Sequence, residues 1–380
     1  MNINYNVHSH ITFGKNSINQ LPDLLDKYSS KKVMLIYDEG VKKAGIAKKV
    51  IEQVEKANTK IIHFDQVQAN PTNEQVSTAA KIARKEKVDL FIAVGGGSSI
   101  DTAKAVNILM TNASPIEQYG GINQVTHDVL PLIAIPTTAG TSSEVTNVTA
   151  LIDNQKICKY VIIDSKIIPS DVIVDVTFTE TLPKSIAAAT GMDAITHAVE
   201  SYISNSASRL TEYQSLEALK IFFENLPKVV ESNDESAREN MLLGCIIVGY
   251  AFSNANLGLV HGIAHTLSAH FKLAHGMANA AILPYVMEYN APSCAEKMIN
   301  LGKAIQKENS KDDKMTEFIF VEKLKELNRI LKIKSLSEQG IQTSDIEMLA
   351  EETLKEPVLN FNPRKEITKE DVMKIIEKAM

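Results

Sequence analysis

Apolar residues in the first half of the chain gather in short uninterrupted runs, separated by amphipathic stretches. Such runs, rich in β-branched residues, are typical of strands in a buried parallel sheet. Strands are predicted at residues 32–38, 60–64, 89–94, 130–136, 145–153, 160–164 and 172–176. Helices are predicted at residues 44–57, from Thr72 onward and at 99–110. This alternation of strands and helices predicts an α/β domain with a Rossmann-like parallel sheet.

The second half of the chain has a different pattern. Beyond Pro183 the strand-like runs disappear, and apolar residues recur with a helical period. Helices are predicted at residues 184–203, 208–224, 236–254, 258–270, 281–303 and 318–333, and a polar loop at 307–314. We therefore expect two domains, an α/β domain over residues 1–183 and an all-α domain over residues 184–380.

Length and charge narrow the class of protein. A chain of 380 residues is long enough for two cores. Its net charge of −6 argues against nucleic-acid binding, which needs a basic surface. The N-terminal residues lack the pattern of a secretion signal, and no run of about 18 apolar residues occurs. We expect a cytoplasmic protein that does not bind membranes. The three cysteines form no CxxC pair, so they are interpreted as small, partly buried hydrophobes in a reducing compartment.

A glycine-rich junction follows the strand predicted at residues 89–94. Gly95, Gly96, Gly97 and Ser98 stand between that strand and a helix, where free N–H groups and the helix dipole favour an anion such as a diphosphate. The spacing matches neither GxGxxG nor a P-loop, so a plain tight turn is the alternative. Asp38, at the end of an earlier strand, could accept both hydroxyls of an adenosine ribose and would repel a 2′-phosphate. These features predict NAD rather than NADP.

A second loop follows the strand predicted at residues 130–136. Residues 137–144 carry hydroxyl side chains at high density around one glycine. Such a loop suits a polar ligand, although an ordinary turn explains its composition equally well.

Histidines cluster in the second half of the chain. Four of the nine lie between Leu257 and Ala280. His261 and His265 are four residues apart, so on a helix they share one face, and Asp193 and His197 repeat this spacing upstream. A histidine on a helix is more often an ordinary polar residue, but two such pairs favour a site for one divalent metal, with Fe(II), Zn and Mn all suited to these ligands. A metal joined to a nicotinamide would make a hydride-transfer site between alcohols and aldehydes.

Five motifs together carry a family resemblance. They are GGGSSIDTAK, PTTAGTSSEVT, GMDAITHAVESY, AFSNANLGLVHGIAH with AHGMANA, and the terminal NFNPR. In this combination and order the chain resembles the iron-containing (group III) alcohol dehydrogenases over nearly its whole length. Two positions depart from the family pattern: Asn256 stands where glycine is usual, and Ala274 where proline is commoner.

The resemblance implies a role for each site residue. It implies that Asp193, His197, His261 and His275 bind the metal, Fe(II) in preference to Zn. His265 would lie beside the nicotinamide as a proton relay, and His270 would have no role. The residues implied to contact NAD(H) are Asp38, Asn70, Gly95, Gly96, Gly97, Ser98, Asp101, Thr137, Thr138, Thr141, Lys159 and His265. Asp101 would lie near the carboxamide and is counted with His265 as catalytic, and Phe252 would form a wall of the substrate pocket.

The expected function is an NAD-dependent, metal-dependent alcohol dehydrogenase that acts as an aldehyde reductase on small substrates. Specialised alternatives within the same fold act on lactaldehyde and 1,2-propanediol, on 1,3-propanediol, or on an acid-bearing aldehyde such as sulfoacetaldehyde or succinic semialdehyde. An enzyme like glycerol dehydrogenase and a non-catalytic dinucleotide sensor are further alternatives. The partner is a small molecule, and the resemblance implies a homodimer.

Overall fold

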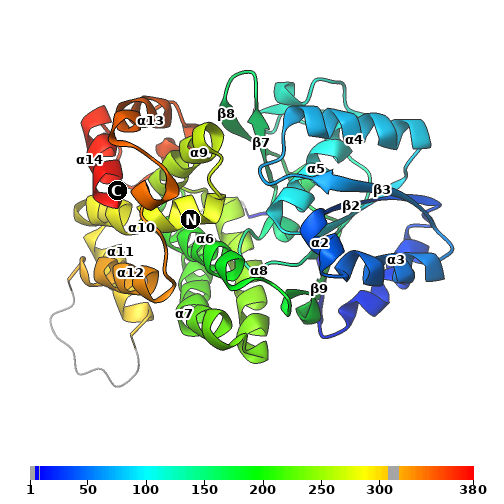
Figure 1. Ribbon diagram of the computed structural model, residues 1–380, viewed down its shortest axis with the longest axis horizontal. Coiled ribbons are helices and arrows are strands. Elements are labelled where there is room, and N and C mark those ends of the chain that lie inside the picture. The colour runs from blue at the N-terminus through cyan, green and yellow to red at the C-terminus, as the bar shows by residue number, and fades with distance from the viewer. Residues whose placement is uncertain (1–4, 8, 307–315) are drawn as a thin grey trace. The chain divides into compact units, whose positions relative to one another are not determined.

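The computed structural model describes residues 5–7, 9–306 and 316–380. The polar loop predicted at residues 307–314 lies outside the described residues. The chain forms two compact units, one of residues Asn6–Leu182 and one that joins Tyr5 to Pro183–Met380 (Figure 1). Each unit is described by itself below.

The first unit is built on a parallel sheet of six strands in the order β1-β9-β6-β4-β2-β3. The strands are β1 (His10–Gly14), β2 (Lys32–Asp38), β3 (Lys60–Val67), β4 (Leu90–Gly95), β6 (Leu132–Pro136) and β9 (Asp171–Asp175). Every residue of β4, β6 and β9 is buried, which explains their continuous apolar runs. The short edge strand β1 was not predicted, because its residues are only half-buried or exposed and form no continuous apolar run.

Helices cover both faces of this sheet. They are α1 (Leu21–Lys27), α2 (Glu39–Lys43), α3 (Ile46–Lys56), α4 (Asn73–Glu86) and α5 (Gly97–Thr111). Alternate residues of β4 point to opposite faces. Phe91 and Ala93 therefore pack with α4 and α5, whereas Leu90 and Ile92 pack with α1 and α3. The predicted parallel α/β architecture is confirmed.

Two local features of this unit differ from the prediction. The helix predicted at residues 44–57 is α3, and the short helix α2 before it was not predicted; Gly45, with a positive φ of 74°, separates the two helices. The strands β7 (Val148–Asp153) and β8 (Cys158–Ile163) pair antiparallel and, with β5 (Gly121–Ile122), form a separate small sheet.

The second unit is helical. Its helices are α6 (Lys184–Ile203), α7 (Arg209–Ser232), α8 (Glu235–Ala255), α9 (Leu259–Phe271), α10 (His275–Asn290), α11 (Ala295–Ala304), α12 (Ile319–Ile330), α13 (Ile346–Thr353) and α14 (Lys369–Ala379). α6 is buried along most of its length and packs against α7, α8 and α10. Its polar side chains, among them Asp193, His197 and Glu200, are therefore buried together with its apolar ones.

Two helix predictions in this unit were wrong in their bounds: α7 continues to Ser232, beyond the predicted end at residue 224. Residues 281–303 are not one helix: α10 begins earlier, at His275, and α11 follows a 3-10 turn at Ala291–Ser293 that contains Pro292. Proline in that turn explains the break. Ala274, at the N-cap of α10, gives no side-chain cap, so the sequence carries no signal for the true start.

Within the described part of the chain, no single helix is long and apolar enough to cross a membrane. Taken together, α8 and α9 are long and apolar enough, but the two helices bend by 99° at the break between them. Asn256 lies at this break with a φ of 61° and a ψ of −179°, a backbone region that is essentially restricted to glycine, so asparagine is strained there.

Candidate functional site

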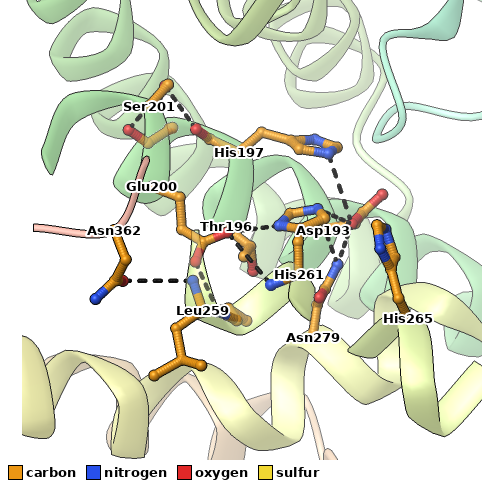
Figure 2. Close-up of polar contacts among 12 residues, drawn as sticks. Asp193, Thr196, His197, Glu200, Ser201, Leu259, His261, His265, Asn279 and Asn362 are labelled. Atoms are coloured by element: carbon orange, nitrogen blue, oxygen red, sulfur yellow. Dashed lines mark hydrogen bonds and ion pairs between the residues drawn. The ribbon is translucent and has the colours of Figure 1, made fainter. Parts of the chain in front are cut away.

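Three helices of the second unit bring the predicted metal ligands together. Asp193 and His197 lie on α6, His261 on α9, and His275 is the first residue of α10. The Asp193 Oδ1 atom lies 3.9 Å from the Nε2 atom of each of the three histidines. Figure 2 shows two of them, His197 and His261, beside Asp193. Donor atoms of Asp193, His261 and His275 all lie within 4.8 Å of one another. The His197 ring is outside that set and stacks on the His261 ring at 4.9 Å.

A neutral donor lies where these atoms converge. Asn279 Nδ2 donates to Asp193 Oδ1 at 2.6 Å and lies 3.4 Å from His261 Nε2 (Figure 2). It also lies 3.3 Å from His275 Nε2. A carboxylate and imidazole nitrogens that surround one hydrogen-bond donor are also suited to surround a cation. This set of N and O donors fits a divalent metal of the Fe(II) or Zn type.

Part of the cluster is shielded from solvent and part is exposed to it. Asp193 and His261 are each 2 % exposed, whereas the His275 side chain is 22 % exposed. Close packing of α10 against α6 brings His275 here: a Cβ on Gly276 would lie 2.2 Å from the Ala189 carbonyl oxygen. The site therefore depends on a glycine beside a ligand.

His265 lies next to this cluster but is not among the closest donors. Its ring stacks on that of His275 at 5.6 Å, and its Nδ1 lies 3.0 Å from Glu356 Oε2. The predicted pocket residue Phe252 is buried and stacks on His197 at 4.3 Å. His270 lies in the last turn of α9. Sequence reasoning missed Asn279 and Glu356. Asn279 could have been found, since it is four residues after His275 on the same helix.

In the first unit, the glycine loop packs against the hydroxyl-rich loop. Gly95 ends β4, and Gly96 is the N-cap of α5. A Cβ on Gly96 would lie 3.1 Å from Thr138 Oγ1, and one on Gly97 would lie 2.9 Å from Thr141 Cγ2. Side chains cannot replace these glycines without displacing the threonines. The N-terminus of α5 thus has backbone N–H groups suited to an anion, next to the predicted threonines.

The other predicted cofactor residues of the first unit lie on separate elements. Asp38 is the N-cap of α2, and its Oδ1 accepts a hydrogen bond from the Val41 backbone at 2.8 Å. Asn70 follows β3 with a left-handed φ of 56°. Thr137 directly follows β6 and donates its backbone N–H to the Gly95 carbonyl at 3.0 Å. Ser98 is in the first turn of α5.

Asp101 lies among charged and polar groups, one turn into α5. Its Oδ1 accepts from Ser143 Oγ at 2.5 Å, and its Oδ2 accepts from the Ala150 backbone at 3.1 Å. Burial raises the pKa of the Asp101 carboxyl, against the opposing positive charges of Lys104 and Lys159. Lys159, on β8, is 8 % exposed. The predicted residues Asp101 and Lys159 thus interact electrostatically.

Two buried charged residues beside Asp101 were not predicted. Lys104 is fully buried, and its Nζ donates at 2.8 Å to the carbonyl oxygens of Thr146 and Val148. Burial lowers the pKa of Lys104 to about 8 and raises that of Glu144 to about 7. The lysine ties α5 to the segment after the hydroxyl-rich loop. The sequence did hold a sign that Lys104 is buried, because it stands among the apolar residues of a helix.

Comparison with known proteins assigns the family. Residues 8–176 match the model of the iron-containing alcohol dehydrogenases, and residues 187–380 match the C-terminal model of the Fe-containing alcohol dehydrogenase family. The chain belongs to the iron-containing alcohol dehydrogenase family, which confirms the resemblance and the predicted oxidoreductase class. The family implies NAD(H) and a divalent metal.

Individual relatives cover nearly the whole chain. Alcohol dehydrogenase 4 of Saccharomyces cerevisiae is 34 % identical over 369 residues, which are 97 % of this chain and 96 % of that protein. Lactaldehyde reductase of Escherichia coli is 34 % identical over 371 residues, 97 % of each chain. The crystal structure of a 1,3-propanediol oxidoreductase matches with a TM-score of 0.94 at 32 % identity and covers all of both chains.

Proposed function

We propose that this protein is an NAD-dependent alcohol dehydrogenase that acts chiefly as a reductase of small aldehydes. In this proposal Asp193, His197, His261 and His275 hold one divalent metal, Fe(II) in preference to Zn. The observation that carries it is the approach of three imidazole Nε2 atoms to within 3.9 Å of Asp193 Oδ1, around a hydrogen-bond donor. When bound, a divalent metal in this set supplies a Lewis acid for the substrate oxygen.

His265 handles the proton in this proposal. The Glu356 carboxylate lies 3.0 Å from Nδ1 of the ring, and the proposal assigns proton exchange with the alcohol or with solvent to Nε2. The ring lies against His275, the most exposed of the four proposed ligands by side chain. A relay at that position would connect the reacting oxygen to water.

The first unit binds NAD(H) in this proposal. The diphosphate lies at the N-terminus of α5, against Gly95, Gly96, Gly97 and Ser98. One Asp38 oxygen caps α2, and the other is left to accept from the adenosine ribose. Asn70, the three threonines and Lys159 complete the site, and Asp101 lies near the carboxamide. The Asp38 carboxylate would repel a 2′-phosphate, which favours NAD over NADP.

The substrate is a small primary alcohol or diol and its aldehyde. Phe252 supplies an apolar wall beside His197, which suits a short carbon chain. Relatives named for 1,3-propanediol and for lactaldehyde make both alternatives reasonable here. A structural relative is a sulfoacetaldehyde reductase, at 26 % identity and a TM-score of 0.87, so an acid-bearing aldehyde is included. We further propose a cytoplasmic homodimer.

The test is a panel of aldehydes with NADH, run without oxygen on iron-loaded protein. The panel contains acetaldehyde, butyraldehyde, lactaldehyde, 3-hydroxypropionaldehyde, sulfoacetaldehyde and succinic semialdehyde. We expect activity with short aldehydes that is lost on treatment with a chelator and restored by Fe(II). Full activity in the metal-free protein would exclude the metal role, and no activity with any aldehyde would favour the sensor alternative.

A further inference from the structure

A buried carboxylate joins two of the ligand-bearing helices. Glu200 lies on α6, three residues after His197, and is 1 % exposed. Its Oε2 lies 2.6 Å from His261 Nδ1, on α9 (Figure 2). Its Oε1 accepts from the Val260 backbone N–H at 2.7 Å. The carboxylate therefore contacts both the side chain of one proposed ligand and the backbone beside it.

These contacts also cap the N-terminus of α9. The first N–H groups of a helix have no partners within it, and the N-cap residue here, Gly258, has no side chain to supply one. Glu200 Oε1 accepts from the Val260 N–H, and Asn362 Oδ1 accepts from the Leu259 N–H at 3.4 Å. A Cβ on Gly258 would lie 3.1 Å from both of these oxygens. Glycine at this position leaves room for two caps that come from distant segments.

The cap from Asn362 gives a structural role to the NFNPR motif, which contains none of the proposed ligands. Asn362 is the second asparagine of NFNPR, and it exchanges two hydrogen bonds of 2.9 Å with Asn290, at the end of α10. The terminal motif therefore links the start of α9 to the end of α10. Those helices carry His261 and His275.

The chemistry of Glu200 sets the state of the His261 ring. A buried carboxylate is costly unless it is hydrogen-bonded, and here the helix N–H groups and the positive end of the helix dipole stabilise its charge. An ionised carboxylate only accepts hydrogen bonds, so Nδ1 of His261 carries the hydrogen. The lone pair is then on Nε2, which is the atom near Asp193. A metal ligand needs that lone pair.

We propose that Glu200 is a positioning residue of the metal centre. It fixes the tautomer and orientation of His261, and it fastens that ligand to α6, which carries Asp193 and His197. This inference rests on the proposed function, because it requires that the four residues bind a metal. It adds a carboxylate behind the ligands, in the manner of other metal sites in which a second carboxylate orients a histidine.

The test is the metal affinity of Glu200→Gln, measured by competition with a chromophoric chelator for Zn²⁺ and by the absorption spectrum of Co²⁺-loaded protein. Glutamine has the same shape but only one accepting oxygen, so it cannot serve both the imidazole and the backbone N–H. We expect affinity to fall by about 10- to 100-fold and the Co²⁺ spectrum to change. The matched control is Ser201→Ala, which removes a buried hydroxyl of α6 bonded to Ser215 Oγ and the His197 carbonyl. Its affinity should equal that of the wild type.

A second variant covers the case in which Glu200→Gln does not fold. Gly258→Ala keeps the carboxylate but places a Cβ against it, and affinity should fall in the same direction. Wild-type affinity and an unchanged Co²⁺ spectrum in either folded variant would overturn the inference while leaving the proposed function intact. A wild-type protein that binds neither Zn²⁺ nor Co²⁺ would instead refute the proposed metal centre, and the inference would fall with it.

Discussion

Glu144 is a buried carboxyl whose ionisation should make the stability of the protein depend on pH. Its side chain lies in the short 3-10 helix Ser143–Val145 and is 2 % exposed. Burial raises its pKa from 4.5 to about 7, although its own backbone N–H and the charge of Lys104 oppose the rise. Each pKa unit corresponds to about 1.4 kcal/mol, so ionisation costs the folded state about 3 kcal/mol.

The sign follows from linkage. The pKa of this acid is higher in the folded state than in the unfolded chain, so the folded state holds its proton more tightly. The contribution of protonated Glu144 to the free energy of unfolding is fully present below pH 4.5 and is lost as the pH rises through 7. The substitution Glu144→Gln removes the ionisation and keeps the shape. The variant should match the wild type at pH 5 within about 1 kcal/mol and exceed its free energy of unfolding by about 3 kcal/mol at pH 8.

The measurement is urea unfolding at pH 5, 6, 7 and 8, followed by circular dichroism. The control is Glu55→Gln on α3, an exposed carboxylate that should not change the pH dependence. Equal stability differences between Glu144→Gln and wild type at pH 5 and pH 8 would refute the reasoning. That result would mean that the carboxyl is already ionised, and paired with Lys104, across the whole range.

Three further predictions concern the proposed sites. His265→Ala should lower turnover by about 100-fold or more while NADH affinity, measured by fluorescence titration, is kept; unchanged turnover would remove His265 from the mechanism. Asp38→Gly should relax the preference for NADH, and a KM comparison in which the wild type already favours NADPH would contradict the role of that carboxylate. Gly276→Ala places a Cβ 2.2 Å from the Ala189 carbonyl oxygen, so we expect about 1–3 kcal/mol lower stability in urea unfolding and weaker Zn²⁺ binding; wild-type values of both would refute the packing argument.

Local patterns in the sequence identified much of the first unit. The buried strands β2, β4 and β6 are readable because parallel strands covered on both faces need continuous apolar runs. The glycine loop after β4 is readable because strand, loop and helix N-terminus are contiguous in the chain. Thr72 is likewise the N-cap of α4, with its Oγ1 accepting from the Gln75 N–H at 3.3 Å.

The histidine cluster was only partly readable. Spacing alone pairs His261 with His265, since both lie on one face of α9. In the structure the tight donor set instead joins His261 to Asp193 and His275, whereas His265 lies against Glu356. The resemblance to a family, and not the spacing, had implied this division.

Local sequence patterns were enough to predict most of the buried strands and helices, the glycine loop and the presence of ligand-type residues, because these depend on neighbours along the chain. Which ligands meet, and which residues lie behind them, depends on how separate helices pack. Glu200 and His261 are sixty-one residues apart, and Asn279 is eighty-six from Asp193. Such pairs form only when separate helices pack, and a buried polar group such as Lys104 is tolerated only because packing supplies its partners.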